Sequence, residues 1–342
     1  MPTDPKVYQT NVCVYCTRPF WLGMCGLDSL LMSRYQFLCR IFEKVEVLFV
    51  TRSALICPLP GETLSVQGPL VAQDVASVKL WCRRNKISFH YSFLDCLPGL
   101  IEHLDGQKFC EISDVWHLRD KAFSAFGYSH GGNEKAELSN MAFYDTVFVL
   151  NPNEANYLLQ KGIAHARQLL PCASFNAINA SGAASDAGMI GAANHPNAHG
   201  VRQLYDFVSR IESFALAGDI CGLQDSRFLP QEKVTYLGRV PDAAEFYQHV
   251  MTVVSPIQFG AGLKMKVLEA ISHGKPLLAT AHSVEGYPIG IEEFVAIGGD
   301  PKDWATADLE RAQAAANIEH QRDYIEQNFS DRALLACLTA VL

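Results

Sequence analysis

The sequence predicts an α/β protein built from two similar halves, and two observations support this class. Apolar segments typical of strands alternate with helical segments almost throughout the 342 residues, as in parallel sheets built from βαβ units. The segment 171–188 is rich in alanine, serine, glycine and asparagine and lacks a clear period, so it predicts a linker between the halves. The chain is also long enough for two domains of ordinary size.

The individual elements follow from these apolar patterns. In the first half we expect strands at 11–16, 45–50, 87–91, 108–112, 146–150 and 167–170, with helices between them. The second half restarts at Met189, with a helix near 200–210 and strands at 214–217, 234–237, 250–254 and 274–280. The tail from 306 to 342 is helical in pattern and is interrupted near 328–331, where Ser330 is a candidate helix cap.

Composition excludes several classes of protein. A net charge of −8, a pI near 5.8 and the lack of a basic stripe argue against nucleic acid as a partner. No apolar run reaches the roughly 18 residues needed to span a bilayer, and the amino terminus lacks a signal-peptide pattern, so we expect a cytoplasmic protein. The 11 cysteines are odd in number and scattered, which fits reduced thiols. Cys13 and Cys16 form one C-x-x-C, for which core packing is favoured over zinc or redox chemistry.

The segment 255–270 is the most informative part of the chain. It follows the apolar strand pattern 250–254, and Gly260 and Gly262 permit a tight turn with close approach of the backbone. A helical pattern over 263–272 comes next. A helix that begins here offers unpaired N–H groups and the positive end of its dipole to an anion.

Two charged residues sharpen this interpretation. Lys264 adds a full positive charge at the helix start, and the carboxylate of Glu269 can accept hydrogen bonds from ribose hydroxyls. The alternative is an ordinary strand-to-helix turn with a solvated lysine. A second apolar strand at 274–280 weakens this alternative, because it ends in the polar loop 281–286. Ligands of open α/β sheets sit at such strand ends.

The segment 255–286 resembles the donor-binding signature of nucleotide-sugar glycosyltransferases with the GT-B fold, in particular the retaining enzymes of glycosyltransferase family 4, the group 1 family. The residues that carry the resemblance are Pro256, Gly260-Ala261-Gly262, Lys264, Glu269-Ala270, Gly274-Lys275-Pro276 and Glu285-Gly286. The resemblance implies two Rossmann-like domains with parallel sheets that face a central cleft. The expected boundaries are an acceptor-side domain at 1–171, a linker at 172–188, a donor-binding domain at 189–315 and terminal helices at 316–342 that pack back on the first domain.

The resemblance also implies roles for single residues. Lys264 would contact the donor diphosphate and Glu269 the ribose. The catalytic candidates are Lys264, Glu269, Asp114 and Arg119. The donor-binding candidates are Gly23, Gly260, Ala261, Gly262, Leu263, Ser283, Glu285, Gly286 and His199.

The first half holds the weaker signals. The loop 17–26, which contains Gly23, resembles the glycine-bearing first loop of GT-B enzymes, and Arg18 there is either a phosphate contact or a solvated side chain. Where the family often has histidine and aspartate, this chain has Ser113 and Asp114, with Arg119 downstream. Asp114 is equally interpreted as a hydroxyl ligand or a helix cap. His117 has no partner identifiable from sequence, so a packed or exposed side chain is the favoured interpretation.

The start of the second half departs from the family pattern. Many relatives carry an arginine and a lysine after the first glycine, whereas here Gly191 is followed by an asparagine- and proline-containing loop with neither cation. A subset of the family has such a loop. The diphosphate would then be stabilised by Lys264 and the helix dipole, with His199 or Arg202 as further candidates.

The expected reaction is therefore transfer of a sugar from a nucleotide diphosphate donor to a hydroxyl acceptor, with retention and without a metal or other cofactor. The expected partners are the nucleotide sugar and a glycan or lipid-linked acceptor in surface polysaccharide or glycolipid synthesis. Peripheral contact with the inner face of the membrane would be assisted by exposed aromatic residues such as Trp21 or Trp81, whose alternative is core packing. Two other functions stay open: a catalytically silent GT-B subunit and a sugar-nucleotide epimerase or hydrolase.

Overall fold

The computed structural model describes residues 8–17, 20, 26–51, 59, 63–67, 72–93, 97–129, 131–179 and 182–341. Their contacts divide the chain into two units. The first unit comprises the described residues within 1–120, 130–172 and 337–342, and the second those within 121–129 and 173–336. The short segment 121–129 therefore belongs to the second unit, although in sequence it lies between two segments of the first unit.

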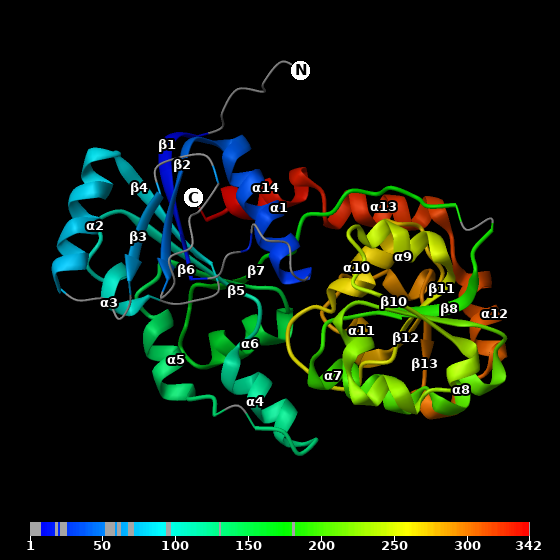
Figure 1. Ribbon diagram of the computed structural model, residues 1–342. Coiled ribbons are helices and arrows are strands. Elements are labelled where there is room, and N and C mark those ends of the chain that lie inside the picture. Colours follow the sequence, from blue (N-terminus) through cyan, green and yellow to red (C-terminus); the bar gives the residue numbers. More distant parts are fainter. Residues whose placement is uncertain are drawn as a thin grey trace. The chain divides into compact units, whose positions relative to one another are not determined.

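The first unit is a parallel sheet with helices between its strands (Figure 1). Its elements are β1 (Tyr8–Cys16), α1 (Gly26–Ile41), β2 (Phe42–Thr51), β3 (Thr63–Gln67), α2 (Ala72–Arg84), β4 (Ile87–Phe93), α3 (Pro98–Ile101), β5 (Gln107–Ile112), α4 (Trp116–Ser124), α5 (Glu134–Met141), β6 (Thr146–Val149), α6 (Pro152–Gln160) and β7 (Ala166–Gln168). The seven strands lie in the order β3-β2-β1-β4-β5-β6-β7. Every neighbouring pair is parallel.

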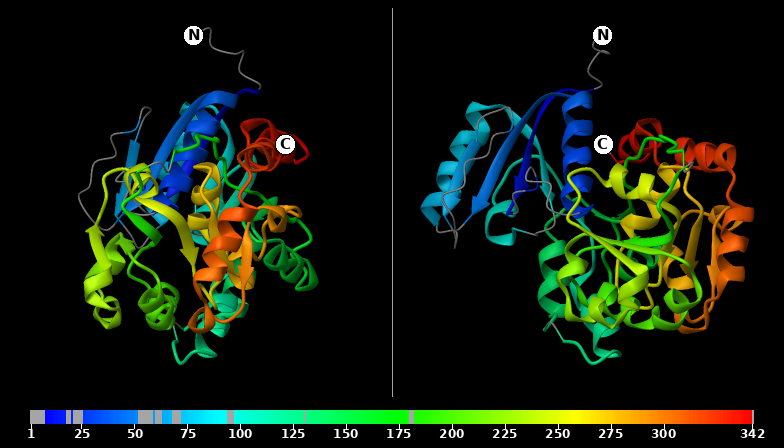
Figure 2. Two further views of the ribbon diagram at one scale, coloured as in Figure 1. Left: turned by 90° about the vertical axis from the view of Figure 1, so that its right-hand side faces the viewer. Right: turned by 45° about the vertical axis from the view of Figure 1, so that its right-hand side comes forward.

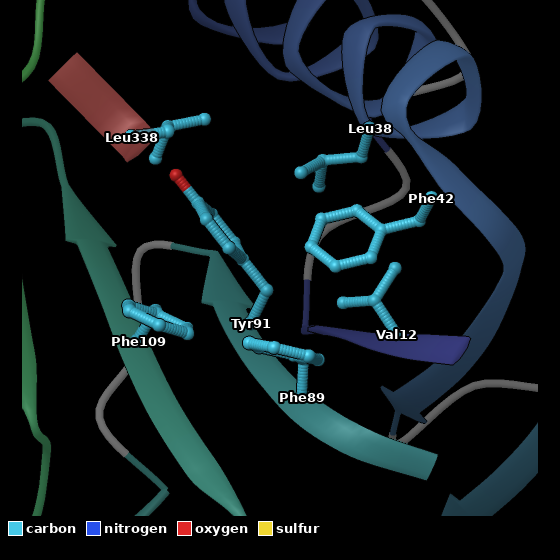
Figure 3. Close-up of a pocket in the computed structure, with 7 residues that line it drawn as sticks. All are labelled: Val12, Leu38, Phe42, Phe89, Tyr91, Phe109 and Leu338. Atoms are coloured by element: carbon cyan, nitrogen blue, oxygen red, sulfur yellow. The ribbon is translucent and has the colours of Figure 1, made fainter. Parts of the chain in front are cut away.

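One face of this sheet is filled by aromatic rings and by a residue from the end of the chain. Phe109 stacks between Phe89 and Phe148, with ring centroids 6.2 Å apart on each side. Figure 3 shows Leu338, from the last helix, converging on this face together with Leu38 of α1. The space left between these side chains is only ≈ 10 Å³, so it is a packing defect of the core.

A buried ion pair fixes α1 to the middle of the same sheet. The Arg34 Nε and Nη2 atoms donate to the Glu111 carboxylate at 2.8 and 3.0 Å. Tyr91 donates to the same carboxylate at 2.7 Å, and Arg34 also reaches the Leu170 carbonyl. Because both charges are buried, losing either partner would strand the other, and the pair serves the fold.

The second unit has the same kind of architecture (Figure 2). Its elements are β8 (Ser185–Ile190), α7 (His195–Gln203), α8 (Tyr205–Arg210), β9 (Phe214–Ala217), η2 (Asp219–Gly222), η3 (Gln224–Phe228), η4 (Gln231–Lys233), β10 (Val234–Gly238), α9 (Ala243–His249), β11 (Val250–Ser255), α10 (Met265–Ser272), β12 (Leu277–Thr280), α11 (Ala281–Val284), η5 (Ile291–Glu293), β13 (Ala296–Gly298), η6 (Pro301–Asp303), α12 (Thr306–Ala315), α13 (Ile318–Asn328) and α14 (Asp331–Thr339). The last helix begins in this unit and ends in the first.

The six parallel strands of the second unit lie in the order β10-β9-β8-β11-β12-β13. Strand order therefore reverses between β8 and β11, which is where open α/β sheets bind ligands. The helix that follows each of these two strands, α7 and α10, begins at this edge. Helices α7, α8 and α12 pack on one face through a core that includes Phe207 and Trp304.

The α/β class and most predicted strands are confirmed. The differences are local: β3 and β13 were not expected, and β8 begins at Ser185, inside the segment predicted as linker. The single helix expected near 200–210 is two helices that meet at Leu204. Ser330 does cap the last helix, because its hydroxyl accepts the Ala333 N–H. Trp81 is 8 % exposed and packs in the core, so it is not an exposed aromatic for membrane contact.

Candidate functional site

The loop between β11 and α10 depends on glycines for its path. Gly260 and Gly262 have φ values of 132° and 63°, a region that disfavours residues with a Cβ. Gly200 of α7 packs against this loop so closely that a Cβ there would lie 2.9 Å from the Pro256 carbonyl oxygen. The glycines therefore bring the starts of α7 and α10 together at the edge where strand order reverses.

Two lysines lie at the start of α10, and each hydrogen-bonds to neutral groups. The Lys264 ammonium donates to the carbonyls of Ala261 and Gly262 at 3.2 and 3.1 Å. Lys266 donates to the side-chain oxygen of Asn197, in the first turn of α7. The pKa of Lys266 is lowered to about 7, mainly by burial; the charge of Glu269 opposes this shift, and the charge of Lys264 adds to it.

Asparagine side chains shape the start of α7. Asn194 caps the helix by accepting the Asn197 N–H at 3.0 Å. Asn197 is 6 % exposed, and its amide group donates to the Ala192 carbonyl at 2.8 Å. The side-chain oxygen of Asn197 thus holds Lys266 beside the start of α7.

Glu269 lies one turn further along α10, in a largely apolar environment. Burial raises its pKa, opposed by a hydrogen bond from Tyr247 and by the charge of Lys266. The Tyr247 hydroxyl donates to Glu269 Oε2 at 3.1 Å. Tyr287 orients the same helix: its hydroxyl donates to the Lys264 carbonyl at 3.1 Å and accepts the Leu268 N–H at 3.0 Å.

The loop after β12 places His282 and Glu285 beside the glycine turn. His282 Nδ1 and Glu285 Oε2 are 2.9 Å apart. Burial lowers the pKa of His282, and Lys264 lowers it further. Ser283 is fully buried and its hydroxyl donates to the Ser255 carbonyl at 2.7 Å, so this side chain joins two loops. Gly286 has a φ of 89°, which allows the chain to turn after Glu285.

A second polar chain runs from α7 towards β13. His199 Nε2 lies 2.8 Å from the Gln258 side-chain oxygen, and Gln258 donates to Asp300 at 3.4 Å. The rings of Phe126 and Phe259 stack beside this chain, with centroids 4.1 Å apart. His199, which was predicted to bind the donor, is therefore hydrogen-bonded to Gln258. Arg202, the other candidate of this helix, forms a salt bridge with Asp225 at 2.6 Å.

In the first unit, the predicted residues form ion pairs. Asp114 and Arg119 are joined at 2.9 Å. His117 has partners that the sequence did not reveal: Glu137 at 2.6 Å and the Tyr157 hydroxyl at 2.8 Å. Glu137 also accepts the first N–H groups of α4, at Trp116 and His117, which makes it the cap of that helix.

Three positions named from the sequence lie outside the described residues: Arg18, Trp21 and Gly23. Of the other predicted donor residues, Leu263 is buried and Ala261 lies in the glycine turn. The structure adds Lys266, Asn197, Tyr247 and Tyr287 to the candidate site. Lys266 is the one that a sequence signal could have identified, since it shares the helix start with Lys264.

The described part of the chain contains no group of three or more histidine, cysteine, aspartate or glutamate residues that could hold a metal ion. Cys13 and Cys16 are buried in β1, as core packing requires. None of the described helices combines the length and the apolar character that crossing a membrane demands.

Comparison with known proteins agrees with this geometry. Residues 184–312, all in the second unit, match the family described as glycosyl transferases group 1. No curated protein gives a significant match. Among solved structures, HepE from Anabaena in complex with UDP is 14% identical, with a TM-score of 0.69 over 98% of this chain and 100% of that one.

Two further solved structures are similar over nearly the whole chain. A glycosyltransferase from Rickettsia africae ESF-5 is 10% identical, with a TM-score of 0.66 over 97% of both chains. An alpha-glucosyltransferase in complex with UDP and a 13-mer DNA is also 10% identical, with a TM-score of 0.65 over 97% of this chain and 99% of that one. At such identities the likeness establishes the fold. The GT-B fold predicted from the sequence is thereby confirmed.

Proposed function

We propose, from the match of residues 184–312 to the group 1 glycosyl transferases, that this protein transfers a sugar from a nucleotide diphosphate donor to a hydroxyl acceptor. The donor diphosphate would lie at the start of α10, between the glycine turn and Lys266. The neighbouring structures determined with UDP support uridine as the nucleoside.

The observation that carries this proposal is the state of Lys266. Its ammonium is desolvated enough to lower its pKa to about 7, and it hydrogen-bonds to the neutral amide of Asn197. In the described part of the chain, no salt bridge joins it to a carboxylate. A diphosphate would supply the missing negative charge and restore the protonated lysine.

The chemistry follows from where charge develops. As the bond between sugar and phosphate breaks, negative charge accumulates on the departing diphosphate. Lys264 and Lys266, together with the positive end of the α10 dipole, stabilise that charge more strongly in the transition state than in the bound donor. These groups are already in place, so little reorganisation accompanies the reaction.

Glu269 would orient the nucleoside. Its carboxylate can accept hydrogen bonds from ribose hydroxyls, and the hydrogen bond from Tyr247 holds it in one position. Retention at the anomeric carbon, independence of metal ions and a role in polysaccharide or glycolipid synthesis are further parts of this proposal. They are supported only by the resemblance of 255–286 to retaining enzymes.

The test is release of nucleotide diphosphate from the donor. Purified protein would be incubated with UDP-hexoses and GDP-hexoses, with and without glycan acceptors, and free UDP or GDP would be measured. Acceptor-dependent release that Lys264→Met abolishes and Lys121→Met preserves would support transfer, because Lys121 is an exposed lysine of the same unit. UDP binding without release from any donor would instead favour a silent subunit. Isomerisation of a free UDP-hexose would favour an epimerase.

A further inference from the structure

We propose that a recess of ≈ 430 Å³ in the second unit binds a single neutral hexose ring. It lies beyond the carboxyl ends of β12 and β13, two and three strands from β8, and is distinct from the lysine cluster at the start of α10. Its lining comprises Phe126, Gln258, Thr280, Ala281, His282, Gly298, Gly299 and Asp300. The volume is within the range of small-molecule sites.

The polar groups of the recess suit hydroxyl groups and not an anion. The lining that the structure describes contains no lysine or arginine. Burial acts to raise the pKa of Asp300, but the hydrogen bonds and the charge of Lys302 together outweigh it and lower that pKa, so the carboxylate stays an acceptor. Gln258 adds an amide beside it, and Nδ1 of His282 is held by Glu285. Sugar hydroxyls can donate to such acceptors, whereas the described lining offers a phosphate no lysine or arginine.

An aromatic face completes the site. Phe126 is 40 % exposed although its ring is stacked on the buried Phe259. Its ring also meets His199 edge to face, with centroids 5.2 Å apart. The ring is thus fixed from two sides and presents apolar area to the recess, which suits the apolar C–H face of a pyranose. Gly298 and Gly299 also line the recess, and the lack of side chains there lets a ligand approach the backbone closely.

The recess adjoins the proposed diphosphate position through His282. The imidazole of His282 lines the recess, and the charge of Lys264 contributes to lowering its pKa, so the two groups are near each other. A hexose bound here could therefore be the sugar of the donor or a sugar of the acceptor. The choice between a donor sugar and an acceptor sugar rests on the proposed function, whereas the binding of a hexose does not.

The experiment compares ligands with and without a hexose. UDP, UDP-glucose, UDP-galactose and UDP-N-acetylglucosamine would be titrated by calorimetry, and the free sugars would be examined by saturation-transfer NMR in the presence of UDP. The variants are Asp300→Asn, which keeps the shape and the helix-cap acceptor, and Phe126→Ala. Their controls are Asp303→Asn, on the same turn, and Phe228→Ala, an aromatic residue that is 61 % exposed.

We expect each recess variant to weaken hexose binding about tenfold, because Asp300→Asn removes a charged acceptor and Phe126→Ala removes the apolar face, while UDP affinity changes less than about twofold. If the loss appears only with UDP-hexoses, the recess holds the donor sugar; if it appears only with free sugars, it holds the acceptor. Hexose binding that is undetectable or insensitive to both variants would overturn the inference. A protein that fails to bind UDP at all would refute the proposed function instead, and the NMR arm would still report on the recess.

Discussion

Two charged clusters, one around Asp114 in the first unit and one around Lys266 in the second, are neutralised differently. In the first unit a carboxylate pairs with a guanidinium, because Asp114 Oδ2 and Arg119 Nη1 lie 2.9 Å apart. In the second unit, Lys266 hydrogen-bonds to an amide and Glu269 to a phenol. Charges that are already paired gain little from an anionic ligand, whereas charges held by neutral dipoles gain a great deal. This contrast supports our proposal that the second unit binds the nucleotide diphosphate.

The largest expected effect comes from removing both lysines of the second unit. In a Lys264→Met, Lys266→Met variant, UDP affinity should fall about 100-fold or more, because two charge-assisted contacts of about 1.5–3 kcal/mol each are lost. Calorimetry would measure this, with Lys121→Met as a control for the loss of an exposed lysine from the same unit. Equal affinity of variant and wild type would place the diphosphate elsewhere.

The pH dependence of binding sharpens the comparison. The pKa of Lys266 is about 7 without ligand, so above this pH the protein must take up a proton to bind an anion there. UDP affinity should fall by up to about tenfold per pH unit above pH 7, until the raised pKa of the complex is passed. In Lys266→Arg the charge persists at these pH values and the affinity should become nearly independent of pH. A wild-type profile that is flat from pH 7 to 9 would contradict the assigned role.

Lys275 tests the energetic cost of a lysine without an opposing charge. It is 1 % exposed, its ammonium has no hydrogen-bond partner in the described part of the chain, and burial lowers its pKa to about 8. Lys275→Met should raise the free energy of unfolding of the second unit by about 1–3 kcal/mol near pH 7.

The pH dependence of stability gives a second readout for Lys275. Between the lowered pKa of Lys275 in the folded state and its unfolded value of about 10.4, the unfolded chain binds more protons than the folded chain. The buried Lys275 therefore makes the stability of the wild-type protein rise with pH in that window. The substitution should remove this rise. Denaturant unfolding at several pH values would show it, and a variant less stable than wild type at pH 7 would refute this account.

The smallest effect is expected in the first unit. Asp114→Asn and Arg119→Gln should each change UDP affinity less than about twofold, because these two charges already neutralise each other. Their predicted catalytic role concerns transfer, so UDP release in the presence of acceptor should be measured in parallel. A tenfold loss of UDP affinity in either variant would show that the first unit contributes to diphosphate binding.

Much of the fold could be predicted because most strands are buried apolar runs in a regular alternation with helices. The exceptions are instructive. β13 is only three residues long, Ala296–Gly298, and carries no periodic signal, while the linker composition extended over the start of β8. Propensity reports local preference, whereas these strands are defined by pairing with neighbours already in the sheet.

The candidate site was predicted only in part for a similar reason. The glycine turn, Lys264 and Glu269 lie in one continuous segment, so their spacing is visible in the sequence. The contact between Lys266 and Asn197 joins residues 69 positions apart, and it exists only because α7 and α10 begin at the same edge of the sheet. Ser283 illustrates another limit of the sequence. The residue lies in the segment after β12 that was predicted to bind the donor, but its hydroxyl is buried and donates to the backbone carbonyl of Ser255.

The most direct test of the central claim is the number of protons exchanged when UDP binds. Calorimetric titrations of the wild-type protein and Lys266→Arg at pH 8, in buffers with different ionisation enthalpies, give this number. The account predicts uptake of close to one proton by the wild-type protein and little by the arginine variant. Tight UDP binding with the same proton exchange in both proteins would contradict the claim that the desolvated lysine at the start of α10 receives the diphosphate.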